Sequence, residues 1–68
     1  MRSWLKRYED ALRQVTAGQD VLAQQRAVIE RLKSHGQDTT WLEDGLRLFE
    51  RSQAIFEEDL ERIRRECH

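Results

Sequence analysis

The 68-residue chain has no proline, only three glycines and a single cysteine. Proline and glycine are the residues that most strongly break a helix, so their scarcity leaves long stretches free to stay helical. The lone Cys67 excludes an intrachain disulfide framework. No apolar run approaches the roughly 18 residues of a membrane-spanning helix, so the sequence predicts no membrane association.

An excess of charge of either sign is also missing. Lys and Arg number 12 against 13 Asp and Glu, which gives a net charge of −1 and no general attraction to nucleic acid or to an anionic bilayer. The N-terminal residues carry charges without the apolar stretch of a signal peptide. A free cysteine agrees with a reducing compartment. We therefore expect a cytoplasmic protein.

The residues that are present favour an all-α fold. Apolar residues make up 38% and charged residues 37% of the chain, a balance typical of long helices. Apolar positions alternate at spacings of three and four in two segments, which predicts two amphipathic helices. The first pattern comprises Leu5, Tyr8, Leu12, Val15, Leu22 and Ile29, with Gln19 and Arg26 completing it. The second comprises Leu42, Leu46, Phe49, Gln53, Phe56, Leu60, Ile63 and Cys67.

A helix end and a helix start lie between these segments. Gly36 suits the left-handed position that closes a helix, and Asp38, Thr39 or Thr40 would cap the next one. Thr40 and Glu43 have the spacing of a capping box. We predict one domain over residues 1–68, with helix one at 2–34, a loop at 35–38 and helix two at 39–66. A short loop between equal amphipathic helices predicts an antiparallel, coiled-coil-like hairpin.

Two features of helix one leave alternatives open. Gly18 could divide it and produce a three-helix bundle, although one glycine costs only about 1 kcal/mol in a helix interior. If the hairpin turns near residues 36 and 37, Gln19 lies opposite Gln53, and the two amides either form a buried pair that selects the register or lie at a wet boundary.

A second apolar stripe exceeds what one hairpin needs. Trp41, Leu48 and Ile55 recur every seven residues outside the main pattern of helix two, and helix one has its own extra set that begins with Trp4 and Ala11. Exposed apolar stripes usually mark an interface. We therefore predict that two hairpins form a homodimeric four-helix bundle, with these residues at the interface.

The sequence contains no pattern typical of catalysis, of a cofactor site or of a metal site. His35 falls in the loop, and Cys67 and His68 are adjacent at the end of the chain. Neither histidine follows a glutamate by three residues, so the Glu-x-x-His pair of di-iron bundles is excluded. We predict that the protein is not an enzyme and holds no cofactor.

Basic residues gather where the two ends of the hairpin meet. They are Arg2, Lys6, Arg7, Arg62, Arg64 and Arg65, and Trp4 and Tyr8 could stack on bases beside them. Acidic neighbours dilute this cluster, so we do not expect nucleic acid as the main partner. The leading prediction is a non-enzymatic protein–protein interaction or structural module, and the alternative is a helical bundle that binds RNA through this basic end.

Residues 25–39 have the pattern Gln-Arg-x-x-Ile-x-x-Leu-x-x-x-Gly-x-Asp-Thr, which is followed by Leu46, Phe49, Glu50 and Ser52. The region from about residue 19 to 60 resembles a group of small bacterial helical-hairpin proteins with no assigned function. The resemblance implies a hairpin and carries no activity. Gly45 replaces an aliphatic residue of that pattern, and Phe56 stands where histidine is common.

Overall fold

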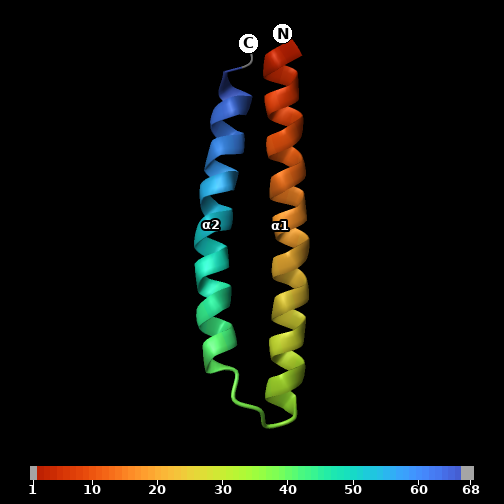
Figure 1. Ribbon diagram of the computed structural model, residues 1–68, viewed down its shortest axis with the longest axis vertical. Helices are drawn as coiled ribbons and strands as arrows, with labels where there is room; N and C mark the ends of the chain where they lie inside the picture. Colours follow the sequence, from red (N-terminus) through yellow and green to blue (C-terminus); the bar gives the residue numbers. More distant parts are fainter. Residues whose placement is uncertain (1, 67–68) are drawn as a thin grey trace.

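The structure is a hairpin of two long helices. A computed structural model describes residues 2–66, with side chains from Ser3 onward. Helix α1 runs over Arg2–Ser34 and α2 over Thr40–Arg65, and the two pack side by side with the start of α1 and the end of α2 at the same end of the rod (Figure 1). No strand occurs within residues 2–66, and the molecule measures 53 × 15 × 14 Å. The predicted all-α class and the two-helix form are confirmed.

Gly36 closes α1 as predicted. Its φ of 75° lies in the left-handed region, which costs glycine little because it has no Cβ. The backbone N–H of Gly36 donates to the Lys33 carbonyl oxygen at 2.9 Å, and that of Gln37 donates to the Leu32 carbonyl oxygen at 2.9 Å. These two bonds form a Schellman motif, which satisfies carbonyl groups that the helix end leaves unpaired.

The start of α2 differs from the predicted capping box. The Oδ1 atom of Asp38 accepts hydrogen bonds from the backbone N–H of Thr40 at 3.0 Å and from its hydroxyl at 2.7 Å. These bonds hold the pKa of the Asp38 carboxyl below its usual value. The Thr39 side chain, at the cap position, makes no capping bond, and Glu43 pairs with Lys33 instead. The prediction of a reciprocal capping box formed by Thr40 and Glu43 is therefore wrong.

The buried seam between the helices is small. Its apolar residues are Val15, Leu22, Ile29 and Ile63, and Gly18, Thr39 and Gln53 are buried with them. Leu5 and Leu12, which belong to the apolar pattern predicted for helix one, are 49% and 41% exposed. The residues of α1 that face α2 are instead those one position earlier in the sequence than the predicted pattern. Trp4, Ala11 and Leu32 are half-buried, and Gly18 is buried.

Gly18 and Gln53 explain this rotation of α1. The Nε2 atom of Gln53 donates to the Val15 carbonyl oxygen at 2.7 Å, and the rest of its amide lies where a Cβ on residue 18 would be. With the amide in this position, only glycine leaves this space free. Helix α1 is continuous through Gly18, so the three-helix alternative is wrong. Of the two alternatives for Gln19 and Gln53, the buried amide pair does not form, because Gln19 is exposed whereas Gln53 is buried.

Candidate interaction surface

The two sides of the hairpin, flanking the buried seam, differ in polarity. On one side, two ion pairs join the helices. Arg26 Nη2 lies 2.6 Å from Glu50 Oε2, and Lys33 Nζ lies 2.6 Å from Glu43 Oε1. The hydrogen bond to Glu43 and its charge raise the pKa of Lys33. This side is therefore polar and bridged within the chain.

The other side of the hairpin carries an apolar face. We give this name to the exposed or half-exposed side chains of Val21, Val28, Trp41, Leu48, Phe49, Ile55 and Phe56. Trp41 is 74% exposed, Leu48 62% and Ile55 61%. Such residues are normally scattered singly over a protein surface, whereas these recur along both helices at helical spacing. The face is therefore a continuous apolar strip rather than a set of isolated side chains.

A shallow groove shows that both helices contribute to this face. It is lined by Val21 and Gln25 of α1 and by Trp41, Leu42, Gly45, Leu46 and Phe49 of α2. A Cβ added at Gly45 would meet no atom within 4 Å. The groove is therefore open at Gly45 and bordered by the aromatic rings of Trp41 and Phe49.

The apolar face does not extend to the open end of the hairpin. There the same side is lined by Arg7, Asp10, Gln14 and Asp59, next to Ala11 and Ile63. Arg7 Nη1 lies 3.2 Å from Glu66 Oε2, which joins the two helices near their ends. The face is thus confined to the middle and loop-proximal parts of the rod.

The predicted interface residues fall into two groups. Trp41, Leu48 and Ile55 lie on the apolar face. Trp4 and Ala11 are half-buried in the hairpin itself, so the expectation that they are surplus to it is wrong. Trp4 Nε1 donates to the Ile63 carbonyl oxygen at 2.8 Å, and its ring stacks on Tyr8 with centroids 5.3 Å apart. Phe49 and Phe56, which belong to the main apolar pattern predicted for helix two, are 39% and 37% exposed and contribute part of their surface to the face.

The basic residues at the open end are largely paired with acidic neighbours. Lys6 pairs with Asp10, Arg7 with Glu66, Arg62 with Asp59, and both Arg64 and Arg65 with Glu61. The side chain of Arg2 lies outside the described part. These carboxylates reduce the positive potential that a phosphate backbone would meet.

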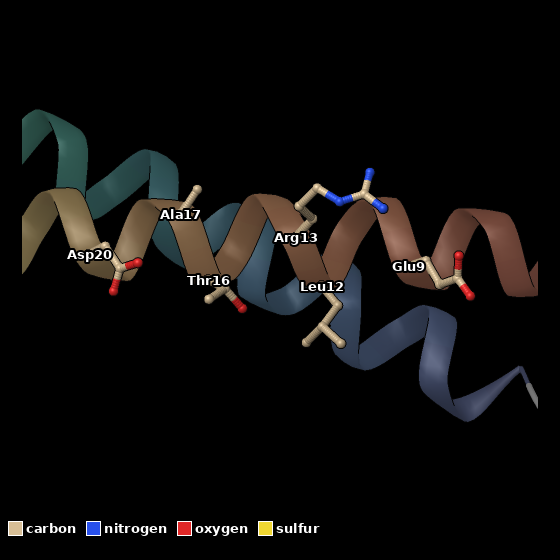
Figure 2. A pocket seen from close by; sticks show the side chains of 6 residues that line it. All are labelled: Glu9, Leu12, Arg13, Thr16, Ala17 and Asp20. Carbon is tan, nitrogen blue, oxygen red and sulfur yellow. The ribbon is translucent and has the colours of Figure 1, made fainter.

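A hollow on the surface of α1 offers no convergent chemistry. Figure 2 shows its lining residues, Glu9, Leu12, Arg13, Thr16, Ala17 and Asp20, and all of them belong to α1. The carboxylates of Glu9 and Asp20 are separated by about three helical turns, roughly 16 Å of rise, so they cannot act on one atom.

The other predicted chemical candidates are also placed by the structure where it describes them. No group of three or more His, Cys, Asp or Glu that could hold a metal ion occurs within residues 2–66. The Nδ1 atom of His35 lies 2.8 Å from the Arg31 carbonyl oxygen at the end of α1. Cys67 and His68 lie outside the described residues. Within the described range, neither helix is long and apolar enough to cross a membrane.

Comparison of the chain with protein-family models, curated proteins and solved structures finds no match. The resemblance to bacterial helical-hairpin proteins therefore stays a prediction. The most distinctive feature of the hairpin is the apolar face.

Proposed function

We propose that this protein is a non-enzymatic interaction module that works as a homodimeric four-helix bundle. The observation that carries the proposal is the apolar face, where Trp41, Leu48 and Ile55 each expose more than half of their surface. Contiguous apolar strips on small proteins usually form interfaces, because leaving them in water costs about 25 cal/mol per Å².

A second hairpin is the partner that best meets the needs of this chain. Among the residues whose side chains the structure describes, the buried apolar core of one hairpin comprises only Val15, Leu22, Ile29 and Ile63. Chains of this size bury too little surface for a robust single core, and association is a common remedy. Packing two apolar faces together would double the number of helices around one core and cover Phe49 and Phe56 as well.

A role in nucleic-acid binding is less well supported. The candidate basic residues at the open end have carboxylate partners wherever their side chains are described, Lys6 with Asp10 and Arg7 with Glu66 being examples. The polar surface of the bundle, outside the paired apolar faces, is then available for a protein partner. Protein binding is therefore the leading proposed function.

Sedimentation equilibrium tests the dimer directly. We expect a dimeric mass in the micromolar range, together with a melting temperature that falls on dilution, because folding and association are linked in a dimer. A monomeric mass over this range, with a melting temperature independent of concentration, would overturn the proposal.

A further inference from the structure

We infer that the two hairpins pair with their loops at the same end, so that α1 of each copy packs beside α2 of the other. This inference rests on the proposed homodimer and specifies how the apolar faces meet. The two-fold axis would run parallel to the rod. Each residue of the second copy then lies at the same height along the rod as in the first, which makes the facing residues predictable.

The contacts within one hairpin set these heights. Gln53 of α2 lies beside Gly18 of α1. Arg51 is two residues nearer the loop than Gln53, so it is level with Asp20. Glu58 is five residues nearer the open end, so it is level with Arg13. A rotation about an axis parallel to the rod preserves these levels between copies.

The apolar side chains match in this arrangement. Leu48 faces the partner's Val21, and Trp41 faces the partner's Val28, each within about half a helical turn in height. The large side chains of α2 thus meet the medium-sized valines of α1. Gly45 and Ser52, which lie between the large residues on α2, leave room for neighbouring side chains of the other copy. Phe49 and Phe56 turn toward the centre of the bundle.

The charges along the outer edge of the same contact also match. Arg51 flanks Leu48 and Ile55 at spacings of three and four, and Asp20 flanks Ala17 and Gln24 in the same way. Arg51 would face the partner's Asp20, and Glu58 would face the partner's Arg13. Asp20, Arg51 and Glu58 have no ion-pair partner among residues 2–66 of their own chain, whereas Arg13 pairs with Asp10. Each dimer would gain these contacts twice.

The opposite arrangement, with the loops at opposite ends, fits less well. It would pack α2 against the partner's α2. The register that covers Trp41, Leu48 and Ile55 together pairs Leu48 with the partner's Leu48 and Trp41 with the partner's Ile55. It brings Arg51 beside the partner's Asp44, a carboxylate that already pairs with Arg47, and it places Glu58 level with the partner's Asp38. Like charges at such a contact are unfavourable. A shift of the register by seven residues, about two helical turns, removes this contact but places Trp41 level with the partner's Arg62.

Disulfide trapping distinguishes the two arrangements. In a Cys67→Ser background, we would oxidise Val21→Cys and Leu48→Cys chains separately and then as a mixture in which one chain carries a mass label. We expect a covalent heterodimer in the mixture and little covalent dimer from Leu48→Cys alone, because a disulfide requires Cβ atoms about 3.5–4.5 Å apart. Covalent dimer from Leu48→Cys alone would overturn the same-end arrangement.

Charge reversal provides a second test of the same inference. Arg51→Glu should raise the dissociation constant of the dimer roughly tenfold, and adding Asp20→Arg should restore it. An Asp20→Arg change that does not rescue Arg51→Glu would contradict the proposed contact. Sedimentation of the parent chain separates the two failures, since a monomer overturns the proposed function, whereas a dimer with the wrong cross-links overturns only this arrangement.

Discussion

At residue 18, a methyl group would overlap the amide of Gln53, which donates to the Val15 carbonyl oxygen. We predict that Gly18→Ala lowers the free energy of unfolding by about 1–3 kcal/mol through overpacking, even though alanine favours a helix by about 1 kcal/mol. Urea denaturation monitored by circular dichroism measures this change.

Gln53→Ala provides the matched background for this experiment. It removes the amide, so the same Gly18→Ala change should then raise the free energy of unfolding by up to about 1 kcal/mol. The sign of the Gly18→Ala effect should therefore reverse between the two backgrounds. Stabilisation by Gly18→Ala in the parent chain would show that the amide does not occupy this space.

At the scale of the helices, the position of the seam distinguishes two leucines of α1. Leu22 is 6% exposed and Leu12 is 41% exposed. Leu22→Ala should lower the free energy of unfolding by about 2–4 kcal/mol. Leu12→Ala should lower it by about 1 kcal/mol or less, because truncating a partly exposed side chain removes less buried surface and leaves no cavity. If chemical denaturation shows that both substitutions lower the free energy of unfolding equally, then the seam runs along Leu12 instead.

The start of α2 makes stability depend on pH. Thr40 holds the pKa of Asp38 below its ordinary value of 3.8 through two hydrogen bonds to the carboxylate. A lowered pKa in the folded state contributes stability above the unfolded pKa and loses it as pH falls through the folded pKa. We therefore predict that unfolding becomes easier below about pH 4 as Asp38 takes up its proton.

Asp38→Asn isolates this effect, since its side-chain oxygen still accepts hydrogen bonds but does not titrate. Its unfolding free energy should fall less steeply than that of the parent between about pH 4 and pH 2. An NMR titration should give a midpoint for the Asp38 carboxyl below 3.8. A midpoint at or above that value would contradict the capping role.

At the scale of the whole molecule, Leu48 lies on the apolar face, 62% exposed in one hairpin. In the proposed dimer, Leu48→Glu would bury a carboxylate in the contact between copies, which is strongly unfavourable without a partner. We predict a monomeric or unfolded chain by sedimentation equilibrium.

Ala23→Glu is the matched control for Leu48→Glu. Ala23 is exposed on α1 and lies away from the apolar face, so the same added charge should leave the dimer intact. If Leu48→Glu is as dimeric and as stable as Ala23→Glu, then the face is not the interface between copies.

The two helices and the turn between them could be predicted from the sequence because their signals are local. The periodicities ending at Ile29 and beginning at Leu42, together with Gly36 as the only break supported by capping residues, act within a few residues of the chain. The candidate face could be predicted only in part. Trp41, Leu48 and Ile55 stand out by their seven-residue spacing, whereas no pattern in the sequence indicates that Phe49 and Phe56 are partly exposed.

Only the tertiary structure decided which stripe of α1 faces α2. Val15 and Leu22 leave this choice open. The residue that lies between them on the same side of the helix can be either Gly18 or Gln19, since spacings of three and four residues both keep to one side. The choice depends on a residue of the other helix, because the Gln53 amide, held by its hydrogen bond to the Val15 carbonyl oxygen, lies where a Cβ on residue 18 would be. That rotation also brings Arg26 to Glu50 and Lys33 to Glu43 on one side, and so leaves the apolar face on the other.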